Sequence, residues 1–115
     1  MILDFESKKK KNSRPSGEMW KLALYVADWR PNSLAALTNL KRICSEHLEG
    51  RCRIALFDLE KNPELAKKME IVATPTLVKT FPLPLRRAVG DLSNTEWVLE
   101  RLGLPRMIKS DAKVT

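Results

Sequence analysis

The segment 71–79, IVATPTLVK, constrains the fold of this chain more than any other stretch. Its proline stands between two threonines, and a proline fits neither the middle of a helix nor a central strand. The segment therefore predicts a forced turn that enters a strand over 76–81. We expect the Thr74–Pro75 bond to be cis, a form found at only about 5–6% of X-Pro bonds in folded proteins.

The stretch before this turn has the pattern of a βαβ unit. Residues 20–26 form an apolar run that predicts a strand covered on both faces. A helix then begins near Asn32 or Ser33, either of which can cap it, and Gly50 ends it. Residues 52–59 predict a second strand, which a βαβ crossover would place parallel to the first.

Short elements follow on both sides of the turn. Asn62 and Pro63 are typical of the cap and first position of a short helix, which precedes the strand 76–81. Two prolines then interrupt the chain, and residues 85–89 can pair back as an antiparallel edge strand. Gly90 turns the chain once more.

A final helix is signalled after the sequence GDLS. Ser93 and Glu96 have the spacing of a capping box, and Leu92 and Trp97 that of a hydrophobic staple. Pro105 would end the helix. The predicted order is βαβαββα, which is typical of the α/β, thioredoxin-like fold class.

Length and composition predict one folded domain, since the chain has 115 residues of which 43% are hydrophobic. We expect a basic mobile arm over 1–18, the domain over 19–104 and a tail over 105–115. The net charge of +7 sits partly in those ends, without the aromatic and glycine pattern of a nucleic-acid module. No apolar run approaches the roughly 20 residues needed to span a bilayer, so we expect a cytoplasmic protein with neither a membrane nor nucleic acid as partner.

The side chains of enzymatic chemistry are missing. Thioredoxin catalysis needs an activated thiolate at the start of the first helix, where this chain reads DWRPNS over 28–33. Cys44 and Cys52 form no CxxC pair and are predicted to be buried, reduced thiols, and with His47 they make no zinc set. We therefore expect no enzyme activity, metal or cofactor.

Five segments carry a family resemblance. They are LYVADWRPNS (24–33), DLEKNPELA (58–66), IVATPTLVK (71–79), PLPLRRAVGDLS (82–93) and VLERLGL (98–104). Together they resemble the circadian clock protein KaiB family of the thioredoxin-like superfamily, without evident gaps from Trp20 to Leu104.

That resemblance implies a non-catalytic regulator. KaiB proteins bind the RecA-like ATPase ring of the kinase KaiC, capture KaiA and compete with the thioredoxin-like sensor domain of an output histidine kinase. It also implies a homo-oligomer, dimer or tetramer, when the protein is free. A metamorphic alternative fold, βαββααβ, rearranges the C-terminal half. The basic end PRMIKSDAKVT departs from the acidic tail of clock proteins, which leaves open a KaiB-like role in timing or stress signalling outside an oscillator.

By analogy, the resemblance also suggests contact residues. The predicted partner-binding set lies on the short helix, the turn and a basic edge strand, and comprises Asn62, Pro63, Lys67, Lys68, Ala73, Thr74, Lys79, Arg86 and Arg87. Pro75, Gly90 and Asp91 are predicted to act on conformation. Each lysine or arginine is equally typical of a solvated face or of an edge strand protected from aggregation.

Three alternatives remain open at this point. The first is a free-standing thioredoxin-like sensor domain of the histidine-kinase type, which works through protein contacts only. Disulfide exchange is the second, and nucleic-acid binding through the basic arm is the third.

Overall fold

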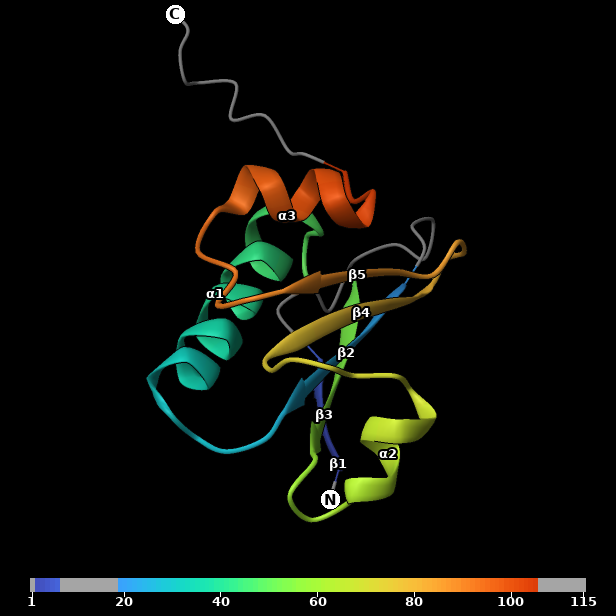
Figure 1. Cartoon of the computed structure of the whole chain (residues 1–115). Coiled ribbons are helices and arrows are strands. Elements are labelled where there is room, and N and C mark those ends of the chain that lie inside the picture. The colour runs from blue at the N-terminus through green and yellow to red at the C-terminus, as the bar shows by residue number, and fades with distance from the viewer. Residues whose placement is uncertain (1, 7–18, 106–115) are drawn as a thin grey trace, which may run out of the picture.

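A five-stranded mixed sheet with helices on its faces organises the chain (Figure 1). The structure, a computed structural model, describes residues 2–6 and 19–105. From Trp20 on, the elements follow the predicted order βαβαββα, which confirms the fold class. The elements are β1 (Ile2–Glu6), β2 (Trp20–Val26), α1 (Pro31–His47), β3 (Cys52–Asp58), α2 (Pro63–Lys68), β4 (Thr76–Phe81), β5 (Arg86–Val89) and α3 (Thr95–Leu102).

The strands lie in the order β1-β3-β2-β4-β5. β2 and β3 are parallel, with Leu22 beside Ile54, as the βαβ pattern predicts. β4 runs antiparallel to both β2 and β5, so it is an interior strand, and β5 is the edge. The chain therefore enters the middle of the sheet directly from the turn at Pro75.

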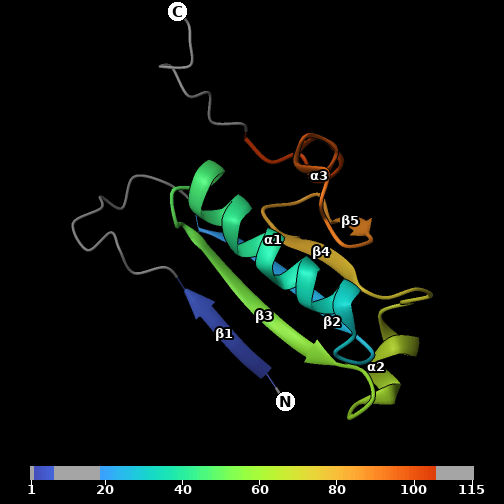
Figure 2. The ribbon, with the colours of Figure 1, turned by 90° about the vertical axis from the view of Figure 1, so that its left-hand side faces the viewer.

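β1 corrects one expectation. The sequence predicted an arm without regular structure over 1–18, yet Ile2–Glu6 pairs antiparallel with β3, with Ile2 opposite Phe57 (Figure 2). An unpaired β3 edge would leave main-chain donors and acceptors open, and a short segment can fill that edge despite weak local propensity. Residues 1, 7–18 and 106–115, which include the rest of the predicted arm and most of the tail, lie outside the described residues.

The two faces of the sheet are covered unequally. α1 and α3 pack on one face over the larger core, and α2 packs at one end of the other (Figure 2). Side chains of β2 point alternately to the two faces of the sheet. Leu22 and Leu24 face the large core, whereas Tyr25 lies on the other face and stacks on Phe57 with ring centroids 5.0 Å apart. Each fully buried large apolar side chain stabilises the fold by roughly 1.5–3 kcal/mol, so the α1 side contributes most of the stability.

Two predicted helix caps are misplaced, that of α1 by two or three residues and that of α3 by one. α1 begins at Pro31 after Arg30, without a side-chain cap, because the proline occupies the first position, where no amide partner is needed. α3 is capped by Asn94, whose side chain accepts from the Trp97 amide at 3.1 Å. The predicted cap, Ser93, instead donates its amide to the carboxylate of Asp91.

Two further side-chain predictions at the helix starts fail. With Asn94 as the cap, Trp97 is the third helical residue rather than the fourth, so the spacing of the predicted staple with Leu92 is lost, and Trp97 is 41% exposed. The predicted cap of α2, Asn62, stands at the cap position but makes no side-chain capping bond.

The two cysteines also depart from the prediction. Cys44, near the end of α1, and Cys52, the first residue of β3, are joined as a disulfide rather than held as reduced thiols. Both are almost fully buried in the large core. The tight connection from α1 to β3 brings the Cα atoms of the two cysteines within 6.3 Å of each other. A separation of eight residues along the chain does not by itself predict this proximity.

Candidate functional site

The exposed part of α2 and the segment after it form one end of the molecule. We call this region the α2 surface. It consists of Pro63, Lys67, Lys68, Val72, Ala73 and Thr74, all of which are exposed. Val72 is 94% exposed, so this end of the molecule presents an apolar side chain as well as two exposed lysines. Five of the predicted contact residues lie in this region, and a sixth, Asn62, is half-buried at its border.

α2 is held to the sheet by its inner side. Leu65, Ala66 and Met69 are only partly buried and pack with Ile71 against the core formed by Tyr25 and its neighbours. No residue of this six-residue helix is fully buried. A helix so short has little stability of its own, so its position depends on contacts made by other elements.

Arg87 supplies the main such contact. From β5, its guanidinium donates to the main-chain carbonyl of Met69 at 2.8 Å and to that of Glu70 at 3.0 Å. A cation is favourable at a helix C-terminus because the last carbonyls lack partners and carry partial negative charge. The sequence analysis predicted Arg86 and Arg87 as two partner-binding residues. In the structure Arg86 is exposed, whereas Arg87 is bonded to the end of α2 and positions the α2 surface.

Lys79 does not lie on an exposed edge strand as predicted. β4 is flanked by β2 and β5, and Lys79 is 4% exposed on the face that carries α3. Its Nζ lies 3.9 Å from the position a Cβ would take on Gly103, just past the end of α3. Burial, and then the nearby charge of Arg86, hold the pKa of Lys79 below its ordinary value. In this arrangement Lys79 is not available to a partner.

A small pocket separates α1 from the turn. It has a volume of about 350 Å³, and its lining is Asp28, Arg30, Pro31, Asn32, Ser33, Thr74 and Pro75. The Thr74–Pro75 bond is cis. Arg30 and Asp28 pair across 2.7 Å at the surface. None of these lining side chains is a thiol, so the pocket offers no thiolate for disulfide exchange.

The predicted conformational residues meet beside this pocket. Gly90 has φ +124°, a backbone conformation that L side chains rarely adopt, and its amide donates to the carbonyl of Pro75 at 2.9 Å. The next residue, Asp91, accepts the Ser93 amide on its carboxylate at 3.0 Å. The Ser93 side chain, and then this amide, lower the pKa of the Asp91 carboxyl below its ordinary value by hydrogen bonding to its charged form.

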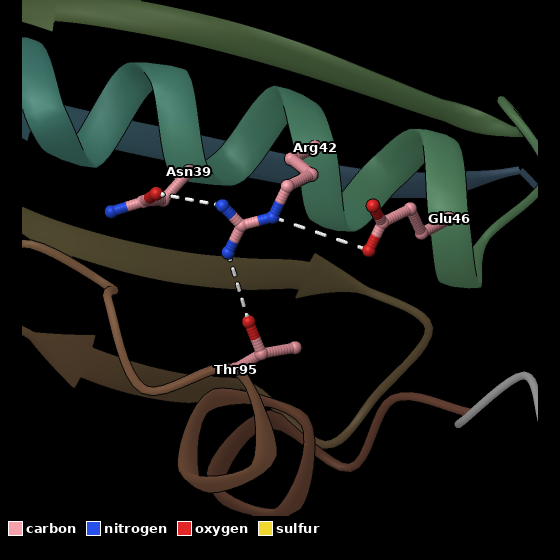
Figure 3. Close-up of polar contacts among 4 residues, drawn as sticks. All are labelled: Asn39, Arg42, Glu46 and Thr95. Carbon is pink, nitrogen blue, oxygen red and sulfur yellow. Dashed lines mark hydrogen bonds and ion pairs between the residues drawn. The ribbon is translucent and has the colours of Figure 1, made fainter.

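A polar cluster on α1 ties the last helix in place, and the sequence analysis did not find it (Figure 3). Arg42 donates to Thr95 at the start of α3 at 3.1 Å and to Asn39 at 3.0 Å, and lies 4.0 Å from Glu46. Asn39 in turn donates to the main-chain carbonyl of Asp91 at 2.8 Å. Helical spacing predicts the contacts within α1, but the contacts to Asp91 and Thr95 span more than fifty residues.

Comparison with known proteins now identifies the fold's family. The family described as "KaiB domain" matches residues 23–104, a stretch that contains the α2 surface, the pocket and the Gly90 turn. The chain belongs to the KaiB family. The circadian clock oscillator protein KaiB of Synechococcus elongatus is 49% identical over 83 residues, which cover 72% of this chain and 81% of that protein. The homologue from Thermosynechococcus vestitus is 46% identical over 90 residues, 78% of this chain and 83% of that one.

Solved structures agree with the thioredoxin-like fold of this KaiB-family chain. The N-terminal domain of Synechococcus elongatus SasA has a TM-score of 0.63 at 22% identity, covering 85% of this chain and 96% of that domain. Chloroplastic thioredoxin z has a TM-score of 0.60 at 24% identity, covering 76% and 79%. Within residues 19–105, no helix has the length and apolar character needed to cross a bilayer.

Proposed function

We propose that this KaiB-family chain is a non-catalytic regulator that docks on a KaiC-like RecA-type ATPase ring and changes its phosphorylation or signalling output. The observation that carries the proposal is the family match over residues 23–104, together with relatives named as circadian clock oscillator proteins. Circadian or other timing regulation is the setting that those names suggest. The absence of a thiol from the pocket at the start of α1 agrees with a binding role.

The α2 surface is the proposed contact region. An exposed apolar side chain at Val72, at the same end of the molecule as the exposed Lys67 and Lys68, resembles the apolar centre and polar rim of a protein interface. The two lysines favour an acidic patch on the ring and would speed encounter at low salt. Arg87 would contribute indirectly, by holding α2 in place, rather than by touching the partner.

Native mass spectrometry of the chain with a purified KaiC-like hexamer and ATP or ADP tests the proposal. We expect a ring complex that weakens by about tenfold or more with Lys68→Glu, since charge reversal at an interface opposes an acidic partner. Lys41→Glu is the matched control, because Lys41 is an exposed lysine of α1 away from the α2 surface. Absence of a ring complex with either nucleotide would refute the proposal.

A second candidate has one observation in its favour, the similarity to the SasA N-terminal domain over 96% of that domain. In that case the chain is a free-standing sensor-type module that binds through the same end without rearranging. The two candidates differ in the second half of the chain. In the regulator proposal that half also adopts the βαββααβ arrangement, with the free protein a dimer or tetramer, and a KaiA-like protein or a sensor histidine kinase is a further partner.

Nuclear magnetic resonance of the free and ring-bound protein separates these candidates. Two sets of amide signals for residues 60–104, exchanging as the oligomer dissociates, would support the regulator that changes fold. A single set that keeps the helix and strand pattern of Figure 1 in both states would support the sensor-type module.

A further inference from the structure

A second surface lies on the opposite edge of β5 from β4, and it includes none of the residues of the α2 surface. It is a groove of about 640 Å³ between β5 and α3, two elements that lie side by side in Figures 1 and 2. We call it the β5–α3 groove. Its lining is Leu85, Arg86, Arg87, Trp97, Glu100 and Arg101.

The groove combines apolar surface with positive charge. Leu85 is 47% exposed and Trp97 is 41% exposed, so both side chains are available to a ligand. The guanidinium of Arg101 lies 5.7 Å from the centre of the Trp97 ring, a cation–π contact that holds the two together. Three arginines against one carboxylate, Glu100, give the lining a net positive charge. A ligand with both acidic and apolar groups matches this chemistry.

The groove also follows an open strand edge. β5 is the last strand in the sheet order, and no other strand of the described residues pairs with its outer side. The Arg101 Nε donates to the main-chain carbonyl of Arg87 at 3.2 Å, which shows that this carbonyl points toward α3 rather than toward β4. Extended peptides bind such edges by main-chain hydrogen bonds, with alternate side chains entering neighbouring pockets.

We propose that the β5–α3 groove binds an extended acidic peptide segment of a protein partner. Carboxylates of the segment pair with Arg86 and Arg101, whose planar guanidinium groups suit bidentate contact. An apolar side chain of the segment rests on Trp97 and Leu85, while the peptide backbone runs beside β5 and its amide replaces Arg101 as the donor to the Arg87 carbonyl. The site shares Arg87 with the support of α2 but includes no residue of the α2 surface.

The observations favour a peptide over single-stranded nucleic acid. Nucleic-acid grooves present successive aromatic side chains for stacking bases along a continuous positive track. Here one tryptophan stands alone among the lining residues, and the carboxylate of Glu100 would repel a phosphate backbone. The donors and acceptors of a strand edge match a peptide main chain instead.

Titration of the isotope-labelled chain with a short acetylated peptide, EVEFEVE, tests the proposal by amide chemical shifts. We expect shifts at Leu85, Arg87 and Val89 and at the Trp97 indole. The matched peptide KVKFKVK, which keeps the apolar pattern and reverses the charge, should not bind. A thymidine oligonucleotide of similar length should bind more weakly than EVEFEVE.

Two variants and two controls complete the test. Trp97→Ala and Arg86→Glu should each weaken binding of EVEFEVE by about tenfold or more, because central aromatic and arginine side chains dominate such interfaces. Trp29→Ala, which alters another half-exposed tryptophan, and Lys41→Glu should bind like the parent. Equal binding of KVKFKVK, tighter binding of the oligonucleotide, undiminished binding by both variants, or shifts confined to α2 would each overturn the proposal.

Discussion

Two neighbouring arginines on β5 should contribute very differently to stability. Arg87 donates to the carbonyls of Met69 and Glu70, whereas Arg86 is exposed and the chain's described part shows no hydrogen bond from its guanidinium. A hydrogen bond from a charged group contributes roughly 1.5–3 kcal/mol. The bond to Glu70 is exposed to solvent and is therefore counted at about 1 kcal/mol or less. Arg87→Ala should cost about 2–3 kcal/mol in free energy of unfolding.

Arg86→Ala is the matched control for this loss. Both substitutions replace an arginine by alanine on the same edge strand, so the change in strand propensity is shared. The main-chain carbonyl of Arg87 that accepts from Arg101 is kept in both variants. Arg86→Ala should therefore change the free energy of unfolding by no more than about 0.5 kcal/mol, as is usual for a surface substitution.

Urea denaturation and thermal unfolding measure the difference. For a domain of this size, about 2–3 kcal/mol corresponds to a melting temperature lower by roughly 8–20 °C. Hydrogen exchange adds a local readout, since the Met69 amide, bonded to Leu65, should exchange faster in Arg87→Ala as α2 detaches. Arg87→Lys should give an intermediate loss, because one ammonium lacks the planar fork that reaches both carbonyls. Equal destabilisation by Arg86→Ala and Arg87→Ala, or unchanged exchange at α2, would refute the role assigned to Arg87.

Further predictions concern titration and the contacts of α1. Burial raises the pKa of Tyr25, the one tyrosine in the sequence, and the nearby charge of Arg87 opposes this with a smaller effect. Tyrosinate absorbance of the folded protein should therefore appear only above the ordinary pKa of 10.0. In Arg87→Ala it should appear at still higher pH, because the opposing charge is gone. Tyr25 ionises at lower pH in the unfolded chain than in the folded protein. Its contribution to stability is therefore complete below pH 10 and is lost as pH rises through the folded pKa. Titration of Tyr25 with an ordinary pKa would contradict its burial. The Ser93 side chain and amide hold the pKa of the Asp91 carboxyl below its ordinary value of 3.8. This group should therefore contribute stability above pH 3.8 that is lost as pH falls through its lowered folded pKa. Carbon chemical shifts measure the titration, and the contribution should be absent in Asp91→Asn. Arg42→Met should lower protection of the α3 amides from hydrogen exchange more than Lys41→Met, since Arg42 donates to Thr95 at the start of α3. Equal effects of the two substitutions would contradict this role of Arg42.

The sequence predicts the elements of this fold better than the contacts between them. Alternation over 20–26 and the helix stop at Gly50 depend on neighbours within a few residues, and the predicted parallel pairing follows from them. β1 was missed because Ile2–Glu6 forms a strand only where the open edge of β3 accepts it. The cap of α3 was misplaced by one residue because Asp91 takes the Ser93 amide and leaves Asn94 to cap.

The candidate site shows the same division. Exposure of Lys67 and Lys68 follows from helical spacing on α2, so it could be predicted from local pattern. The burial of Lys79 could not, because it depends on the end of α3 lying close to its side chain. The pairing of residues 85–89 outside β4 could be predicted from local pattern, but the packing of a distant helix over one face of β4 could not.

The second half of the chain is joined to the first by the pairing of β4 with β2, and its own elements are held together in part by side chains that bond to main-chain carbonyls. Arg87 holds α2, Arg101 reaches β5, and Thr80 donates to the carbonyl of Lys21 on β2. Each such bond contributes only about 1 kcal/mol net, or up to about 3 kcal/mol where the donor is charged. To reverse a two-state equilibrium from 1:99 to 99:1, a partner must prefer one state by about 5.5 kcal/mol. That amount is comparable to a few of these bonds, so a partner that binds α2 and its flanking turn can offset the loss of several of them.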